Sequence, residues 1–203
     1  LSQHIGAACE PIVKPGDTVK IGQKIADTDA FVSAPIHSSV SGKVLKIDLM
    51  PHPTANKAPA IVIENDFKDS RDDCIEPYDG DFDDLTHSEI IGYDRDAGIV
   101  GMGGAAFPLH AKLKTAFDKK IEVIIINGAE CEPFITADYR RMLENPEELV
   151  SGMKVVLSLF DNAKGIFGIE DNKVDCIEKL QELVKDEPRM EVKALKTKYP
   201  QGA

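Results

Sequence analysis

The first third of the chain alternates apolar and polar residues around glycine and proline turns. Segment 13–26 reads VKPGDTVKIGQKIA, and segment 33–48 repeats the alternation around Pro35 and Gly42. Alternation of this kind predicts short strands with one buried face. Two such halves predict a small β-rich domain, a sandwich or flattened barrel, over residues 1–63.

After about residue 98, apolar runs of strand type alternate with segments of helical periodicity. The predicted strands are 121–126, 164–170 and 190–195, and the predicted helices are 109–117, 145–160 and 174–186. Strands that alternate with helices are typical of a parallel sheet with helices on both faces. We therefore expect an α/β domain over residues 93–203.

Two of the predicted helices carry local signals. Asn145 is expected to cap a helix that Pro146 begins, because proline suits the first helical turn. In the earlier helix, Leu109, Leu113 and Phe117 recur one turn apart. They are expected to share one buried face.

Charge is concentrated between the two predicted domains. Residues 64–84 hold ten acids and two bases, which makes −8 of the net charge of −11. A solvated linker over 64–92 is the favoured interpretation, and a docking surface for a basic partner stays open. The acidic balance argues against nucleic-acid binding, which normally needs a basic face.

The cysteine pattern and hydropathy exclude several classes. The cysteines are Cys9, Cys74, Cys131 and Cys176. The absence of a C-x-x-C pair argues against a structural zinc and against an iron–sulfur cluster held by this chain alone. Their wide spacing favours a reducing compartment. No apolar run approaches the roughly 20 residues of a membrane helix, and no signal peptide is visible. The first and last residues suggest a fragment of a longer protein.

Residues 98–108, GIVGMGGAAFP, form a glycine-rich segment that we call the glycine loop. It directly precedes a predicted helix, whose free N–H groups and dipole favour a phosphate. One interpretation is that a phosphorylated or flat ligand lies against the bare backbone. The alternative is a tight turn required only for packing. Gly101, Gly103 and Ala106 match G-x-G-x-x-A, but no strand precedes them as a dinucleotide fingerprint requires.

Polar clusters follow the predicted strands. NGAECEP spans 127–133, EDNK spans 170–173 and YPQGA comes after the last strand. Ligands of open α/β sheets bind at this carboxyl edge. Glu130 and Glu132 are either ligand-facing carboxylates or solvated loop acids.

Other reactive side chains in the sequence favour structural interpretations. Nothing in the sequence marks Cys131 as an activated nucleophile. His37 and His110 are expected to be hydrogen-bonded structural residues.

Several blocks resemble the RnfC subunit family of the Rnf membrane electron-transport complexes, which are ferredoxin:NAD oxidoreductases. In the second part they are GIVGMGGAAFPLHAKL, IINGAECEPFITADYR, GIEDNK and TKYPQGA. LSQHIGA, VKPGDTVKIGQKIA and SAPIHSSVSGKV in the first part match the same family. The family is similar to the NADH-binding flavoprotein subunit of respiratory complex I. The resemblance implies a flavoprotein-like α/β domain preceded by a lipoyl-like barrel-sandwich domain.

The resemblance also implies an FMN site and an NAD(H) site. Residues implied to contact FMN are Gly101, Gly103, Gly104, Lys112, Asn127 and Glu130. Phe107 is implied to stack on the dinucleotide and Glu132 to border its nicotinamide half. Asp171 and Asn172 are weaker candidates at the next strand end. Met102 stands where the complex I subunit has arginine, and Ala129 where it has aspartate.

The function implied is that of an oxidoreductase subunit in a membrane-associated, ion-translocating electron-transport complex. Electrons would pass between NAD(H), FMN and 4Fe-4S clusters, with ferredoxin as an indirect partner. The clusters, and hence the electron exit, would lie beyond Ala203. The expected location is cytoplasmic, peripheral on the inner face of the membrane, with the other Rnf subunits as partners.

Two alternatives stay open for the function. One is an RnfC-like cobalamin reductase, and the other is a non-catalytic docking scaffold that keeps the nucleotide fold. The lipoyl-like part also departs from the carrier pattern. Carriers present a lysine at the hairpin between the two halves, but residues 27–32 read DTDAFV. The first domain is therefore expected to be a docking or structural module.

Overall fold

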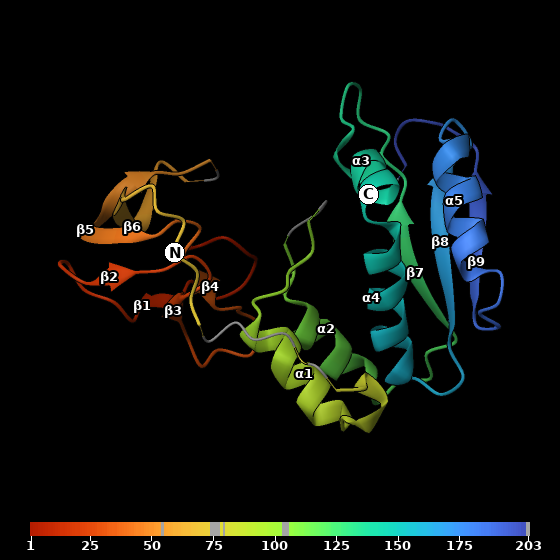
Figure 1. Ribbon diagram of the computed structural model, residues 1–203, viewed down its shortest axis with the longest axis horizontal. Helices are drawn as coiled ribbons and strands as arrows, with labels where there is room; N and C mark the ends of the chain where they lie inside the picture. Colours follow the sequence, from red (N-terminus) through yellow and green to blue (C-terminus); the bar gives the residue numbers. More distant parts are fainter. Residues whose placement is uncertain (54, 74–77, 79, 103–105, 202–203) are drawn as a thin grey trace. The chain divides into compact units, whose positions relative to one another are not determined.

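The computed structural model describes residues 1–53, 55–73, 78, 80–102 and 106–201. The chain divides into two compact units, Leu1–Thr115 and Ala116–Ala203 (Figure 1). The glycine loop therefore belongs to the first unit, together with the amino-terminal strands.

Two small antiparallel sheets begin the first unit. The first has the order β1–β3–β4, with β1 at Glu10–Pro11, β3 at Lys24–Asp27 and β4 at Ile36–His37. The second has the order β2–β5–β6, with β2 at Thr18–Val19, β5 at Gly42–Pro51 and β6 at Lys57–Asn65. Both sheets contribute to one buried cluster, which contains Cys9, Val19, Ile25, Ala26, Ile36 and Val44. The shared core confirms the predicted β-rich sandwich.

A short 3-10 helix, Phe82–Asp84, and helix α1, His87–Asp96, fall in the range predicted as a linker. A capping box begins α1. The Glu89 N–H donates to Thr86 Oγ1 at 3.3 Å, and the Thr86 N–H donates to Glu89 Oε2 at 2.8 Å. Sequence analysis missed this helix because the surrounding negative charge dominated the pattern, although T-x-x-E is itself a helix-start signal.

Helix α2, Leu109–Ala116, follows the glycine loop. Its buried residues are His110, Ala111 and Leu113. The predicted face is therefore correct at Leu113 and wrong at Phe117, which lies past the end of the helix and is 37% exposed. The buried face is turned toward His110 because that side chain has a hydrogen-bond partner inside the first unit.

The second unit is built on a parallel sheet of order β7–β8–β9. Its strands are β7 at Val123–Gly128, β8 at Lys164–Glu170 and β9 at Met190–Leu195. Helices α3, Ala137–Glu144, and α4, Pro146–Ser158, connect the first two strands, and α5, Val174–Val184, connects the last two. The α/β class and the parallel sheet are confirmed.

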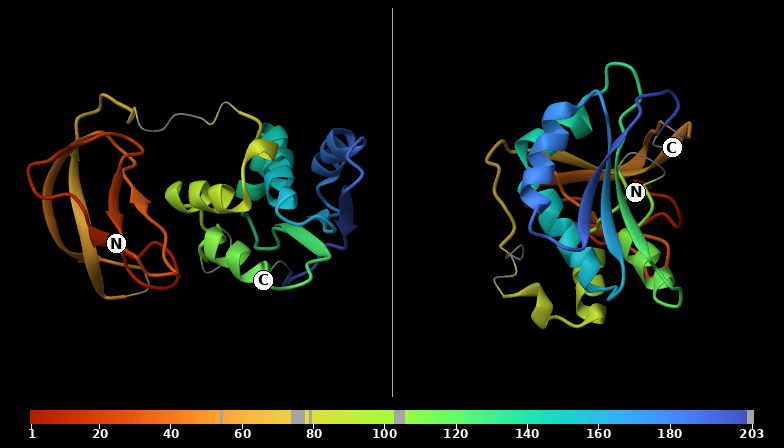
Figure 2. Two further views of the ribbon diagram at one scale, coloured as in Figure 1. Left: turned by 90° about the horizontal axis from the view of Figure 1, so that it is seen from below. Right: turned by 90° about the vertical axis from the view of Figure 1, so that its right-hand side faces the viewer.

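The three helices pack on the same face of this sheet (Figure 2). Phe167 and Ile169 of β8 are fully buried there, against Met153 of α4 and Leu180 of α5. The sequence predicted helices on both faces. On the opposite face of the described sheet, Ile125 is 66% exposed, so within this unit the helical cover is one-sided.

The start of α4 matches the sequence in position but not in its cap. Pro146 is the first helical residue, as predicted. Asn145 stands at the N-cap but makes no side-chain capping hydrogen bond. Its side-chain amide instead donates to Glu148 Oε1 at 3.4 Å. The same residue also ends α3, and its backbone conformation serves both helices.

Asp94 on α1 is a buried carboxylate, and neither of its oxygens has a hydrogen-bond partner among the described residues. Burial raises the pKa of Asp94 from 3.8 to about 7. The folded chain therefore holds a proton that the unfolded chain releases in the window between these two pKa values. The free energy of unfolding should fall as pH rises through that window.

We expect Asp94→Asn to remove this pH dependence, because the amide is neutral at every pH. At pH 8 the variant should be more stable than the wild type by on the order of a few kcal/mol. At pH 5 the difference should shrink. Urea unfolding at both pH values measures it, with the exposed Asp29→Asn as control. An equal difference at both pH values would contradict the assignment.

Candidate functional site

The described ends of the glycine loop form a hairpin neck between α1 and α2. The Gly101 N–H donates to the Phe107 carbonyl at 3.0 Å, and the Leu109 N–H donates to the Ile99 carbonyl at 3.0 Å. Val100 and Pro108 form an antiparallel bridge between these bonds. We call these two strands, 99–101 and 107–109, the neck. The neck fixes where the loop leaves one helix and enters the next.

Two glycines of this loop have different physical reasons. Gly98 has φ +69°, and an added Cβ would lie 2.6 Å from the Pro35 carbonyl oxygen, so packing requires glycine there. At Gly101 an added Cβ would meet only ordinary contacts, 3.7 Å or more from Phe107. Packing among the described residues therefore does not explain Gly101. Its bare backbone is available to an external group.

The other candidates of the first unit lie beside this neck. Phe107 is half-buried within it, and Lys112 is exposed on α2. Met102 is 96% exposed. The predicted residues Gly103 and Gly104 lie outside the described residues.

In the second unit, the Glu130 carboxylate lies under the first turn of α3. Its two oxygens accept the Asp138 N–H at 2.9 Å and the Tyr139 N–H at 3.3 Å. Thr136, the N-cap of α3, makes no side-chain capping bond, so Glu130 supplies the acceptors that this helix end needs. The side chain is only 2% exposed. Its carboxylate is thus engaged inside the unit.

Lys173 joins the two strand ends through a buried ion network. Its Nζ lies 3.3 Å from Glu170 Oε2, 3.2 Å from the Glu130 carbonyl oxygen and 3.9 Å from Glu130 Oε2. Glu170 is fully buried, and its Oε1 has no hydrogen-bond partner among the described residues. One ammonium group therefore holds the ends of β7 and β8 in a fixed relation.

The remaining candidates are more exposed. Asn127 Oδ1 accepts the Ala129 N–H at 3.0 Å and shapes the turn after β7. Asp171 Oδ1 accepts the Thr197 hydroxyl at 2.7 Å, and this bond holds the pKa of Asp171 below its usual value. Glu132 and Asn172 are exposed. The carboxyl ends of β7 and β8 thus bring all five second-unit candidates to one edge of the sheet.

This edge is acidic. Burial, and then the nearby Glu130 and Glu132, raise the pKa of Asp138. Asp138 and Asn127 also help to line a small, mostly apolar cavity of about 70 Å³, next to Met142 and Phe167. Cofactor pockets typically measure about 300–1,000 Å³. A whole nucleotide therefore cannot lie inside this cavity.

The structural interpretation of two other side chains can be checked. His110 Nε2 lies 3.2 Å from the Phe31 carbonyl oxygen, which confirms a hydrogen-bonded helix residue. Cys131 is half-buried and accepts the Gln201 N–H at 3.2 Å. Within the described ranges, no three His, Cys, Asp or Glu side chains gather closely enough to hold a metal ion.

Sequence reasoning missed Glu170 and Lys173. The cluster EDNK was noted, but its two middle residues were chosen as candidates. The available signal was an i, i+3 pair of opposite charge at the end of an apolar strand. Sequence alone does not show that this pair is buried.

Two family profiles match the chain. Residues 1–68 match a family described as the RnfC barrel sandwich hybrid domain. Residues 95–203 match a family described as the Nuo51 FMN-binding domain, which covers more than half of the chain. The second match includes the neck and all the strand-end candidates.

Three curated relatives belong to complexes with related names. The chain is 46% identical to a protein of the Na(+)-translocating ferredoxin:NAD(+) oxidoreductase complex of Acetobacterium woodii, over 100% of the chain and 46% of that protein. It is 50% identical to a protein of the proton-translocating ferredoxin:NAD(+) oxidoreductase complex of Clostridium ljungdahlii, over 99% of the chain and 44% of that protein. A protein of the ion-translocating oxidoreductase complex of Haemophilus influenzae is 36% identical, with 31% of it covered. Each relative is the subunit that has the letter C in its complex. The chain thus spans less than half the length of these relatives.

Helix length and hydropathy were also compared with the needs of a membrane span. None of the helices within the described ranges has both the length and the apolar character to cross a bilayer.

The buried network predicts a large effect of Lys173→Met. Removal of the cation leaves two buried carboxylates uncompensated, which should lower the free energy of unfolding of the second unit by about 3–5 kcal/mol. Lys185→Met breaks an exposed pair with Glu182 and should cost less than about 1 kcal/mol. Urea unfolding followed by circular dichroism measures both. Equal losses in the two variants would show that the network is not a buried ion cluster.

Proposed function

Because the chain belongs to the family of the Nuo51 FMN-binding domain, preceded by an RnfC barrel sandwich hybrid domain, we propose that it binds FMN and NAD(H). The observation that carries the proposal is the match over residues 95–203, which contains the neck and the acidic strand ends. FMN, when bound, accepts hydride from NADH and can release electrons one at a time to iron–sulfur clusters.

The glycine loop fits the flavin part of this proposal. Gly101 leaves open space where a side chain would stand, so a flat ring can approach the backbone. Lys112 projects from the helix that follows and is exposed, so its ammonium group can meet a phosphate or a ring oxygen. Gly103, Gly104 and Phe107 remain proposed contacts from the same loop. These residues orient the ligand, and the chemistry belongs to the flavin.

The strand ends of the second unit fit the remaining part. Asn127 stays a proposed flavin contact, together with the main chain around Glu130. The Glu130 carboxylate already binds two amides of α3, so it holds the turn after β7 in place. Asp171 and Asn172 are proposed as minor contacts from the end of β8.

Glu132 is proposed to border the nicotinamide. Its carboxylate is exposed and makes no hydrogen bond or ion pair with the described residues. A carboxylate at an acidic edge disfavours a phosphate there but favours the cationic ring of NAD⁺. The nucleotide phosphates therefore suit the glycine loop better than this edge.

For the whole protein we propose an electron-transport subunit of an Rnf-type, ion-translocating membrane complex. The other subunits would be its partners, and ferredoxin would be an indirect one. The 4Fe-4S clusters would be held by parts that the longer relatives have in addition. The proposed location is peripheral, on the cytoplasmic face of the membrane. A scaffold that keeps the fold without the cofactor is the competing function, and flavin binding separates the two.

Titration of this chain with FMN, followed by quenching of flavin fluorescence, is the direct test. We expect saturable binding that Gly101→Ala weakens by about tenfold or more, because the methyl group fills the space of the ring. The fold should survive, since the added Cβ meets only ordinary contacts. Gly92→Ala is the matched control, because an added Cβ on that α1 residue has no neighbour within 4 Å. Equal binding by both variants would overturn the assignment of the loop.

Glu132→Gln separates the two ligands. We expect the variant to bind NAD(H) several-fold more weakly and FMN almost unchanged, because the lost charge faces the nicotinamide only. The exposed Glu147→Gln on α4 serves as control. Dissociation constants for both ligands measure the split. A larger loss for FMN than for NAD(H) would contradict the proposed role.

A further inference from the structure

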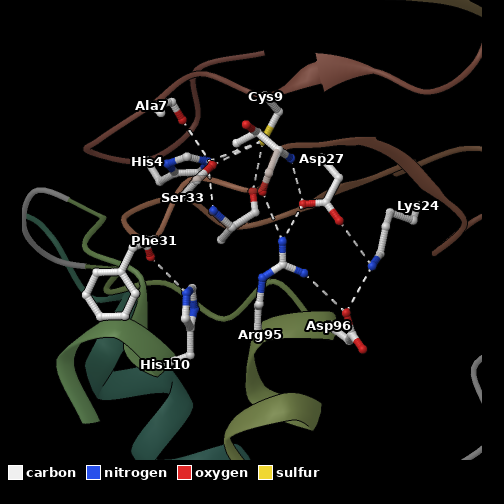
Figure 3. A network of polar contacts seen from close by, with 12 residues as sticks. His4, Ala7, Cys9, Lys24, Asp27, Phe31, Ser33, Arg95, Asp96 and His110 are labelled. Atoms are coloured by element: carbon white, nitrogen blue, oxygen red, sulfur yellow. Dashed lines mark hydrogen bonds and ion pairs between the residues drawn. The ribbon is translucent and has the colours of Figure 1, made fainter. Parts of the chain in front are cut away.

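The loop between β3 and β4, residues 28–35, contacts both helices that flank the glycine loop (Figure 3). On α1, Arg95 Nη2 donates to Asp27 Oδ1 at 3.0 Å and to the Thr28 carbonyl oxygen at 3.0 Å. Arg95 lies in the last turn of α1, directly before the glycine loop. A charge-assisted pair of bonds therefore fixes the helix end from which the neck departs.

The second contact fixes the helix that the neck enters. His110 lies in the first turn of α2 and is 4% exposed. Burial lowers the pKa of His110, so its ring is neutral at pH 7, and Nε2–H donates to the Phe31 carbonyl oxygen at 3.2 Å. The two ends of the glycine loop are thus tied to one short segment of the barrel.

The ionic part of this contact is a chain of alternating charges. Lys24 Nζ lies 3.4 Å from Asp27 Oδ2 and 3.0 Å from Asp96 Oδ1. Burial alone would raise the pKa of Asp27, but the Thr28 N–H, Arg95 and Lys24 outweigh it, and the pKa lies below its usual value. Asp27 is therefore ionised at neutral pH and keeps its pair with Arg95.

The β3–β4 loop is itself held by the amino-terminal segment, as Figure 3 shows. The Ala34 N–H donates to His4 Nε2 at 3.2 Å, and the Cys9 thiol donates to the Ala34 carbonyl oxygen at 3.1 Å. The Ser33 hydroxyl donates to the Ala7 carbonyl oxygen at 3.0 Å. Buried bonds of this kind make the loop a rigid support.

We propose that the β3–β4 loop is a brace for the glycine loop and that Arg95 is its positioning residue, so that FMN affinity depends on the barrel. The inference rests on the proposed function of the glycine loop. The same loop holds the sequence DTDAFV, where a carrier domain would present its lysine. In this chain, Asp27 and the Phe31 carbonyl use that position to hold α1 and α2.

The experiment compares the wild-type chain with Arg95→Ala, Asp27→Asn and the double variant. Hydrogen exchange at the Gly101 and Leu109 amides reports the neck directly, and FMN titration reports the ligand. We expect Arg95→Ala to speed exchange at both amides and to weaken FMN binding, each by about tenfold. The double variant should be no worse than Arg95→Ala, because the two residues act through one contact.

Controls separate a local effect from general unfolding. Asp48→Asn breaks an exposed pair with Lys46 on β5 and should change neither readout. Amides of β5 and β6 should keep their protection in every variant, which shows that the barrel stays folded. Unchanged exchange at Gly101 and Leu109 in Arg95→Ala would overturn the brace. Faster exchange with unchanged FMN affinity would overturn the positioning role.

The two hypotheses fail differently. A wild-type chain that does not bind FMN would overturn the proposed function of this chain, and with it the dependence of FMN affinity on the barrel. The exchange data would then still decide whether the β3–β4 loop holds the neck.

Discussion

Lys173 neutralises part of a buried negative charge at the carboxyl edge of the parallel sheet, and the geometry of that edge depends on it. Two carboxylates and one ammonium group have left water there, which is unfavourable unless each ion is well bonded. Glu130 meets this need through the α3 amides, and Lys173 through the Glu130 carbonyl oxygen. The same bonds fix the turns after β7 and β8, so the residues proposed to meet a ligand inherit their positions from a structural network.

The elements with strong periodicity could be predicted from sequence. The strand 190–195 has the predicted bounds, and Ile177, Leu180 and Val184 of α5 are buried as their spacing indicates. Helix α1 was missed, because a short helix with few apolar residues is specified by its cap rather than by periodicity. The one-sided helical cover could not be predicted, since Val123 and Ile125 have the composition of a buried strand.

For the candidate site, sequence could indicate the place but not the orientation. Glu130 follows a strand as predicted, yet its carboxylate turns toward α3, a helix that the sequence analysis had not identified. The Arg95–Asp27 pair joins residues 68 positions apart, and no local pattern relates them. The family resemblance added the ligand, which residue spacing alone had left open between a phosphate, a flat ring and a packing turn.

The tie between the barrel and the glycine loop separates a boundary of homology from a boundary of folding. The FMN-domain family match begins at residue 95, inside the last turn of α1. A protein cut there would lose the capping box of α1, the acceptor Asp27 and the Phe31 carbonyl that holds His110. The smallest piece that keeps the neck in its native surroundings must therefore include the amino-terminal sheets, although they match a different family.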